Sequence, residues 1–322
     1  LAQSRAAVPN VISHNADWVE YCNAPNDSNI SNPGGGIDWA EVRAANGHPA
    51  PYGIKIWNIG NEPWASPSEY GGTAAGCNAY LTIATPIIDA MLAIDPTIKI
   101  TMPTNGNPVV GNWPYALLNS TLAQQGKIYS LSQHFFGDEN PATLSPSVLA
   151  LNTQLNSLIT AAAAKNIKVF IGDYAHRIPD NPNTAQKDSA MQWLGANLEA
   201  DFLVLLSQKS TIERANFWVY GNATATWHPI RKNSTGNYTI MPAAEIYKIL
   251  FPAFLDNSVP VTTTSPVASD GITGSYSVRS NAFVSSNLNQ LNIVAVNRDK
   301  SNTVPLQVNG VSGYNFNNAK LY

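Results

Sequence analysis

The stretch Lys-Ile-Trp-Asn-Ile-Gly-Asn-Glu-Pro-Trp at residues 55–64 combines a strand pattern with polar residues at its end. The apolar run 54–59 is typical of a buried strand, and Gly60 permits a tight turn after it. Pro63 has no backbone N–H and stops the ladder, which leaves the Glu62 carboxyl at the strand's C-terminal end. In a parallel α/β barrel that end carries the chemistry. The segment therefore predicts a barrel strand with a catalytic carboxyl; the alternative is an ordinary strand end with a solvated Glu.

Three neighbouring motifs accompany this segment: Trp-Val-Glu-Tyr-Cys-Asn at 18–23, Arg-Ala-Ala-Asn-Gly-His-Pro at 43–49 and Pro-Tyr-Gly at 51–53. With Gly-Asn-Glu at 60–62 they resemble the α-L-arabinofuranosidases of glycoside hydrolase family 51. The resemblance is strong over residues 15–64 and looser, but in the right order, to residue 300. It implies a retaining glycosidase on a (β/α)8 barrel, with Glu62 as acid/base at the end of the fourth strand and Asn61 binding a sugar hydroxyl.

Retaining glycosidases need a second carboxyl as nucleophile, about 5 to 5.5 Å from the acid/base. The family has a Glu at the end of the seventh strand, where this chain has Asp173 in Val-Phe-Ile-Gly-Asp-Tyr. Asp is one methylene shorter, and a carboxylate misplaced by about 1 Å can cost on the order of 100-fold in rate. We expect Glu62 and Asp173 to face each other across the barrel mouth. Otherwise Asp173 is a strand-end cap or an ion-pair partner of Arg177.

Aromatic and imidazole side chains follow several predicted strands. His134 lies where the family has a sixth-strand His near the nucleophile, although a hydrogen-bonded core His fits the pattern as well. Trp218, at the end of the eighth strand, matches the aromatic under the sugar ring in this clan. Aromatic faces pack on the apolar faces of sugars, and ordinary packing explains each ring taken singly. The residues expected to bind substrate are Asn61, Trp64, His134, Tyr174 and Trp218, and Trp113, Tyr220 and Trp227 also follow strand ends.

The composition argues against a nucleic-acid partner and for a glycoprotein. Only 12% of residues are charged, against about 25% in typical soluble domains. The net charge is −3 and no basic cluster is present, so the electrostatic footprint of nucleic-acid binding is absent. Covalent N-glycans would keep such a surface soluble, and the sparse charge predicts a secreted, extracellular protein. Six Asn-X-Ser/Thr acceptors are present: Asn26, Asn29, Asn119, Asn222, Asn233 and Asn237.

The two cysteines, Cys22 and Cys77, fit an extracellular compartment as one disulfide, or are two buried free thiols. Their neighbourhoods lack metal-ligand spacing, and the five scattered His suggest no zinc site, so neither a metal nor an organic cofactor is implied. We see no basic-then-apolar signal pattern at the N-terminus and no apolar run approaching the 18 residues of a membrane span.

Apolar runs alternate with helical stretches, as expected for βα units, and after residue 259 a period-2 pattern predicts antiparallel strands. The predicted architecture is a (β/α)8 TIM-type barrel over residues 1–255, followed by a small C-terminal β-sandwich over 256–322. Strands are expected at 54–59, 97–102, 128–135, 167–171 and 214–220, and helices at 16–22, 74–93, 149–165, 191–207 and 243–254.

The strand count raises a problem, because 53 residues precede the strand at 54–59 and three βα units need roughly 90. We therefore expect the first three barrel strands to be missing, either because this is a fragment or processed chain or because another polypeptide or subunit supplies them. A half-barrel of this kind would expose an unpaired edge. Two functions follow. One is an extracellular retaining glycosidase acting on arabinose-containing polysaccharide. The other is a catalytically inactive, glycosidase-derived structural glycoprotein that forms a homo-oligomer or filament through the exposed barrel edge; a carbohydrate-binding protein without turnover is a weaker third.

Overall fold

The chain folds into two compact units in a computed structural model. Unit 1 comprises residues 1–134 and 154–172, and unit 2 comprises residues 135–153 and 173–322. The structure describes residues 10–65, 69–138, 144–177, 193–218, 229–232, 235–259, 261–266, 276–299, 301–310 and 313–314. The units do not coincide with the expected domains, because the predicted boundary at 255/256 lies inside unit 2.

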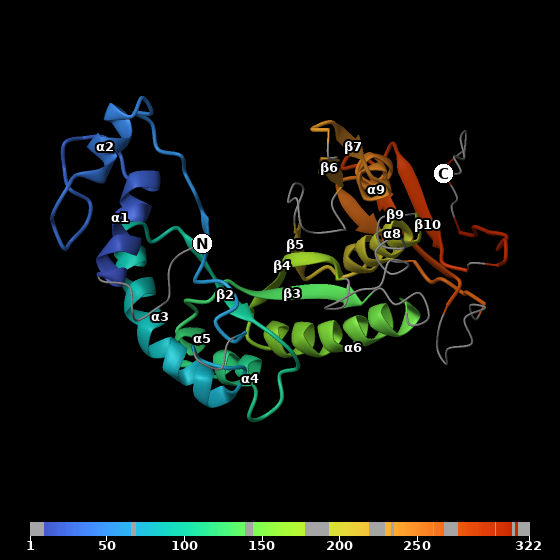
Figure 1. Ribbon diagram of the computed structural model, residues 1–322, viewed down its shortest axis with the longest axis horizontal. Helices are drawn as coiled ribbons and strands as arrows, with labels where there is room; N and C mark the ends of the chain where they lie inside the picture. Colours follow the sequence, from blue (N-terminus) through green and yellow to red (C-terminus); the bar gives the residue numbers. More distant parts are fainter. Residues whose placement is uncertain are drawn as a thin grey trace. The chain divides into compact units, whose positions relative to one another are not determined.

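The central feature is a five-stranded sheet in the order β1-β2-β3-β4-β5 (Figure 1). Its strands are β1 (Ile56–Asn58), β2 (Lys99–Thr104), β3 (Ser130–Asp138), β4 (Lys168–Arg177) and β5 (Ile212–Phe217). β1 pairs in parallel with β2, in the register Trp57 to Ile100, and β2 pairs in parallel with β3. Each of the five strands overlaps one of the five predicted strand positions; their assignment as the fourth to eighth strands of a barrel stays a prediction. Residues 10–53, all of them described, contain two helices and no strand, so β1 is the edge strand among the described strands of this sheet.

Five of the described helices lie wholly within unit 1. They are α1 (Val11–Asn23), α2 (Trp39–Ala45), α3 (Ala74–Ile94), α4 (Trp113–Leu118) and α5 (Thr121–Gln124). Of these, α4 contacts β2. α6 (Leu144–Ala163) crosses the boundary between the units, as do β3 and β4. α3 packs on α1 and α4 (Figure 1). The predicted helix at 16–22 is longer than expected, and the short helices α2, α4 and α5 were not predicted.

The ends of α3 follow from its sequence. Thr73 caps its N-terminus, because the Thr73 hydroxyl accepts from Gly76 N at 3.2 Å, and the helix ends before Asp95-Pro96 as predicted. By length and composition, α3 is the one helix in the described ranges that is long and apolar enough to cross a membrane, so our expectation of no such run was wrong. One third of its most apolar window is buried, and that buried face includes Tyr80, Ile87 and Ile88.

The loop before β1 is held by a buried arginine. Arg43 of α2 is fully buried and donates from three guanidinium nitrogens to the carbonyl oxygens of Tyr21, His48 and Pro49, at 2.8 to 3.0 Å. A guanidinium presents five donors in a fixed fork, so one side chain can bind two carbonyls of the turn and one of α1. This explains why the motif at 43–49 contains both the arginine and the turn that it binds.

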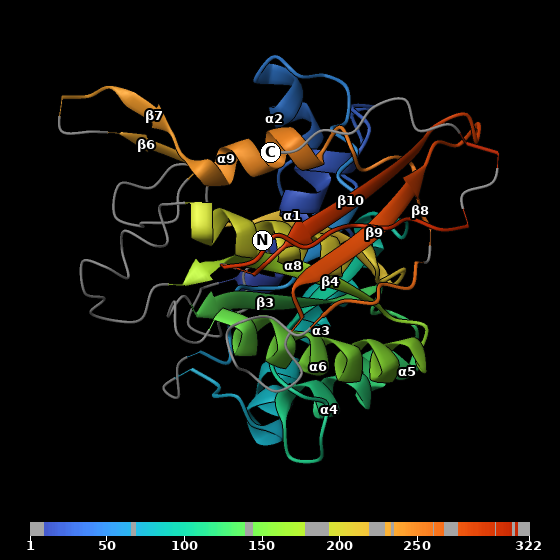
Figure 2. The same cartoon turned by 90° about the vertical axis from the view of Figure 1, so that its right-hand side faces the viewer.

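Unit 2 contains α8 (Trp193–Ser207), the hairpin β6 (Ile230–Lys232) and β7 (Tyr238–Ile240), α9 (Pro242–Leu250), and a three-stranded antiparallel sheet. That sheet has the order β10-β9-β8, from β8 (Asn257–Val259), β9 (Val278–Val284) and β10 (Leu291–Asn297) (Figure 2). The antiparallel strands confirm the period-2 pattern. Their packing partner is α8, which contacts β9 and β10; the second layer of a sandwich stays a prediction. The β6–β7 hairpin was not predicted.

A buried charged cluster joins α8 to this C-terminal sheet. Asp201 of α8 is fully buried and binds Arg279 Nε at 2.7 Å, Arg298 Nε at 3.3 Å and the Tyr276 hydroxyl at 2.6 Å. Both guanidiniums also lie over the Tyr276 ring, at 4.4 and 4.7 Å from its centroid. One carboxylate thus pairs with two cations that are largely out of water.

Asp201→Asn is expected to destabilise the protein strongly. The amide keeps the shape of Asp201 but not its charge, and breaking a buried ion pair costs about 3–5 kcal/mol in the free energy of unfolding. The measurement is denaturant unfolding, and the matched control is Asp89→Asn, whose pair with Lys127 is partly exposed and contributes about 1 kcal/mol or less. Equal losses in the two variants would contradict the role assigned to the cluster.

Candidate active site

Glu62 lies three residues after Ile59, the last residue bonded to β2, and has an unusual backbone conformation. Ile59 N donates to Thr101 O of β2 at 3.0 Å, and Gly60 then turns the chain with φ of 89°. Glu62 itself has φ of 45°, in the left-handed region that costs a non-glycine residue about 1–2 kcal/mol. Its carbonyl accepts from Ala65 N at 2.9 Å, which closes the turn. The side chain is 36% exposed, so the carboxyl is accessible to a ligand.

The carboxyl of Glu62 is bound to His134. Glu62 Oε1 lies 2.7 Å from Nδ1 of His134, a buried residue of β3. An ionised carboxylate accepts a hydrogen bond from Nδ1–H, whereas a protonated carboxylic acid donates a hydrogen bond to an unprotonated Nδ1. The contact can therefore persist in both protonation states of Glu62, as an acid/base residue requires. His134 was predicted to bind substrate near the nucleophile, and the structure places it beside the Glu62 carboxyl.

Gly172 of β4 makes room for this imidazole. A Cβ at position 172 would lie 2.9 Å from His134 Nε2 and 3.0 Å from His134 Cδ2, and would collide with the Ser132 hydroxyl. Real Cβ atoms essentially never come this close, so only glycine lets His134 occupy its position. Sequence reasoning missed this residue, although a glycine inside a strand pattern, directly before the candidate nucleophile, is the signal that could have found it.

A ladder of aromatic rings fixes the turn that carries Glu62. Trp64 is half-buried and meets the His134 ring edge-on at 5.7 Å and the Trp113 ring at 6.1 Å. Trp113 is fully buried, and its indole N–H donates to Pro103 O at 3.0 Å. Tyr80 packs on Trp113 and donates to Ile59 O at 2.6 Å, at the end of β1. Trp113 is therefore a packing residue. Two of the residues predicted to bind substrate keep accessible surface, because Trp64 is half-buried and Asn61 is exposed.

The remaining predicted site residues lie in unit 2. Asp173 is half-buried in β4, and Trp218 follows β5 with 38% of its surface exposed. Trp218 N donates to Tyr174 O at 2.9 Å, which holds these neighbouring segments together. The side chain of Arg177, the alternative partner of Asp173, lies outside the described residues, as do Tyr220 and Trp227.

Tyr174 is a core residue, which corrects the prediction that its ring binds a sugar. It is 4% exposed, and its ring packs against Phe202 and Phe217. Its hydroxyl lies 2.7 Å from the hydroxyl of Tyr247, which in turn donates to the carboxylate of Glu199. Burial and the neighbouring Glu199 charge hold the pKa of Tyr247 far above its ordinary value, so the Tyr247 hydroxyl keeps its proton. A position near the end of a strand does not by itself distinguish a buried tyrosine such as this one from an exposed tyrosine that could contact a sugar.

The two cysteines are buried free thiols, so the candidate disulfide is not formed. The Cys22 carbonyl accepts from Tyr52 N just before β1, whereas Cys77 lies one helical turn from Tyr80, which binds the far end of β1. A strand from residue 53 to 59 is roughly 20 Å long, and a disulfide needs Cα atoms within about 7 Å. Burial raises the pKa of Cys77 to about 12. Burial also raises the pKa of Cys22, although the charge of Arg43 acts in the opposite direction.

The described glycosylation acceptors are all exposed: Asn26, Asn29, Asn119 and Asn237. Asn222 and Asn233 lie outside the described residues. Exposure is what a glycan acceptor needs, and occupancy stays a prediction. Within the described ranges, no group of three or more His, Cys, Asp or Glu side chains is arranged to hold a metal ion.

Comparison with known proteins confirms the resemblance seen in the sequence. Residues 2–140 match the family model of the α-L-arabinofuranosidase 1 domain. The intracellular exo-α-(1→5)-L-arabinofuranosidase 1 of Bacillus subtilis is 30% identical over 152 residues, which cover 45% of this chain and 27% of that protein.

Two solved structures share the fold. A family 51 α-L-arabinofuranosidase from Bifidobacterium longum has a TM-score of 0.70 at 16% identity, over 90% of this chain and 60% of that one. The α-L-arabinofuranosidase from Thermotoga maritima, solved with arabinose, has a TM-score of 0.63 at 19% identity, over 89% of this chain and 58% of that one. The chain thus spans 27% of the Bacillus subtilis relative and 58–60% of the two solved structures.

Gly172→Ala is expected to displace His134 from Glu62. The added methyl overpacks a filled space, which typically costs about 1–3 kcal/mol in the free energy of unfolding. The Nδ1 resonance of His134 should also lose its hydrogen-bonded shift in ¹⁵N NMR. The matched control is Gly72→Ala, because a Cβ there would meet Asn105 Nδ2 at an ordinary 3.7 Å. An unchanged His134 resonance in Gly172→Ala would disprove the space argument.

Proposed function

Because the chain is related to the family 51 α-L-arabinofuranosidases, we propose that it is a retaining glycoside hydrolase that acts on arabinose-containing polysaccharide outside the cell. The observation that carries the proposal is the placement of Glu62. Its partly exposed carboxyl stands beyond β1 at 2.7 Å from His134, inside the segment that matches the arabinofuranosidase domain.

Glu62 is the proposed general acid and base. In the first step its proton passes to the glycosidic oxygen as the bond to the anomeric carbon breaks. In the second step the ionised carboxylate takes a proton from water. The imidazole of His134 positions the carboxyl in both steps, because the contact is available to either protonation state.

Asp173 is the proposed nucleophile. Its carboxylate attacks the anomeric carbon while Glu62 protonates the leaving oxygen, giving a glycosyl ester with inverted configuration; water then cleaves this ester and restores the original configuration. A double displacement of this kind requires the two carboxyls to lie about 5–5.5 Å apart, and the pairing of Glu62 with Asp173 is part of the proposal. Asn61, Trp64 and Trp218 are the proposed sugar contacts, since each is at least partly exposed.

The alternative function is an inactive structural glycoprotein derived from such an enzyme. Two observations favour it: Asp173 stands where the family has Glu, and β1 is an edge strand in the described sheet. An edge strand offers unpaired N–H and C=O groups to a second chain, so assembly into oligomers or filaments would follow. The four exposed Asn acceptors fit either function, because both place the protein outside the cell.

Glu62→Gln is expected to abolish hydrolysis of an aryl α-L-arabinofuranoside that has a poor leaving group. The amide keeps the size of Glu62 but cannot deliver a proton, and general acid catalysis contributes about 100- to 10,000-fold. The matched control is Glu41→Gln, an exposed residue of α2, which should retain wild-type turnover. Equal turnover in Glu62→Gln and wild type would remove Glu62 from the mechanism.

Asp173→Glu separates the two functions. If the wild type is an enzyme slowed by a short nucleophile, restoring the methylene should raise kcat by up to about 100-fold. The glycosyl ester, trapped with a fluorinated substrate, should map to position 173 by mass spectrometry. A lower rate in Asp173→Glu would contradict the chain-length argument. No turnover in either protein, together with concentration-dependent assembly in light scattering, would establish the structural alternative.

A further inference from the structure

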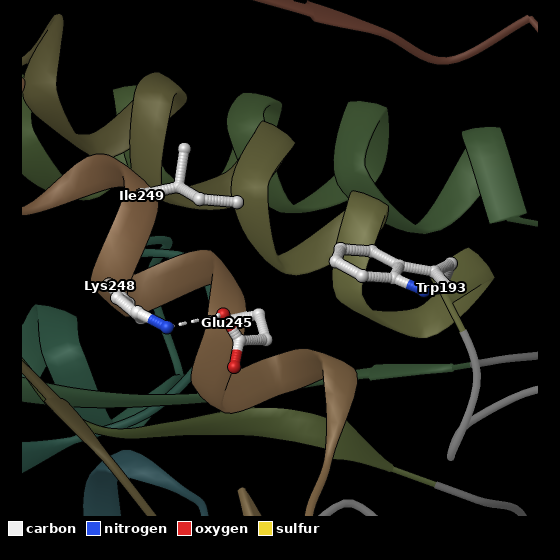
Figure 3. A pocket seen from close by; sticks show the side chains of 4 residues that line it. All are labelled: Trp193, Glu245, Lys248 and Ile249. Carbon is white, nitrogen blue, oxygen red and sulfur yellow. Dashed lines mark ion pairs between the residues drawn. The ribbon is translucent and has the colours of Figure 1, made fainter. Parts of the chain in front are cut away.

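Unit 2 carries a pocket that the proposed chemistry does not use. It has a volume of about 430 Å³ and is lined by Trp193, Glu245, Lys248 and Ile249 (Figure 3). Trp193 is the first residue of α8, and the other three belong to α9. In Figure 3 the indole of Trp193 points toward the α9 side chains. We refer to these four residues as the Trp193 pocket.

The helical period explains why α9 presents these side chains together. Positions 245, 248 and 249 are related by three and four residues, so they share one face of the helix. The other face packs into unit 2 through its buried residues, Ala243, Ile246, Tyr247 and Leu250. Trp193 is 56% exposed, an uncommon state for so large an apolar ring. The pocket is thus built on two packed helices, α8 and α9.

The pocket combines an apolar wall with one donor and one acceptor. Trp193 and Ile249 supply the apolar surface, and Lys248 Nζ lies 3.3 Å from Glu245 Oε2. The two charges are opposite, so together they do not select a charged ligand. The side chain of Lys248 is 75% exposed and that of Glu245 is 35% exposed, and an ion pair this open contributes little. Ligand hydroxyls can therefore bind both groups at small cost.

We propose that the Trp193 pocket is a carbohydrate-binding site for a neutral oligosaccharide. The indole packs against the apolar face of one sugar ring, the Glu245 carboxylate accepts from a hydroxyl, and the Lys248 ammonium donates to another. A sugar is the ligand class with an apolar face rimmed by hydroxyls and no net charge. This site goes beyond the proposed hydrolysis, because binding here requires neither Glu62 nor Asp173.

The test uses ¹⁹F NMR of the full chain labelled with 5-fluorotryptophan, in a Glu62→Gln background so that the probe is not cleaved. The resonance missing in Trp193→Phe identifies Trp193. Titration with α-1,5-linked L-arabinotriose should shift that resonance saturably. Glu245→Gln combined with Lys248→Met should weaken the affinity read at Trp193 by about fivefold or more, as loss of charge-assisted hydrogen bonds does.

Tyr238→Ala is the matched control, since Tyr238 is an exposed aromatic of the β7 strand in the same unit and should leave the titration unchanged. A Trp193 resonance that stays fixed while other tryptophans move would overturn the proposal, as would one that no concentration of the probe shifts. Hydrolysis of the aryl arabinofuranoside by Trp193→Phe with Glu62 intact is measured separately and should equal wild type. Binding at Trp193, with no hydrolysis by the protein that has Glu62 intact, would uphold the pocket and reject the proposed enzyme. Hydrolysis without binding at Trp193 would reject the pocket and uphold the enzyme.

Discussion

The hydrogen bond between Glu62 and His134 joins two strands that do not touch. Glu62 follows β1 and His134 belongs to β3, with β2 between them. Strands two apart in a sheet are separated by about 10 Å, so both side chains must reach toward each other over the end of β2. Three features make the contact possible: the left-handed turn at Glu62, the length of its side chain, and the missing Cβ at Gly172. The contact forms because all three features occur together.

Backbone strain at Glu62 persists because the surrounding packing holds the turn. Tyr80 binds the carbonyl of Ile59, and the Trp113 ring packs between Tyr80 and Trp64. These rings lie on different elements, since Tyr80 belongs to α3 and Trp113 to α4. Strained residues of this kind occur where surrounding contacts over-determine the conformation. The same rings thus stabilise unit 1 and orient the carboxyl that the proposed chemistry needs.

The sequence predicted what is local and missed what depends on distant neighbours. The apolar run ending at Gly60 identified β1, and the proline after Asp95 identified the end of α3, because both signals lie within a few residues of the element. The sequence left both a disulfide and two buried free thiols open, because no local pattern reveals that Cys22 and Cys77 lie near opposite ends of β1; the structure has the free thiols. Tyr174 was misplaced for the same reason: its partner Tyr247 is 73 residues away. The role of Gly172 required knowing that His134 is its neighbour across the sheet.

In the proposed mechanism, the short side chain of Asp173 is hard to compensate by a shift of β4. Its neighbour Gly172 packs against His134 and Ser132 with no space for a single carbon atom, so the strand cannot advance toward β3 without displacing the imidazole. On the other side Tyr174 is locked by Phe202, Phe217 and the Tyr247 hydroxyl. Backbone positions on both sides of Asp173 are therefore fixed by packing. The missing methylene has to be made up by the sugar, which would bind closer to β4, or the proposed covalent step is slowed. For the proposed mechanism, the fixed backbone around residue 173 makes the length of the Asp173 side chain the decisive variable.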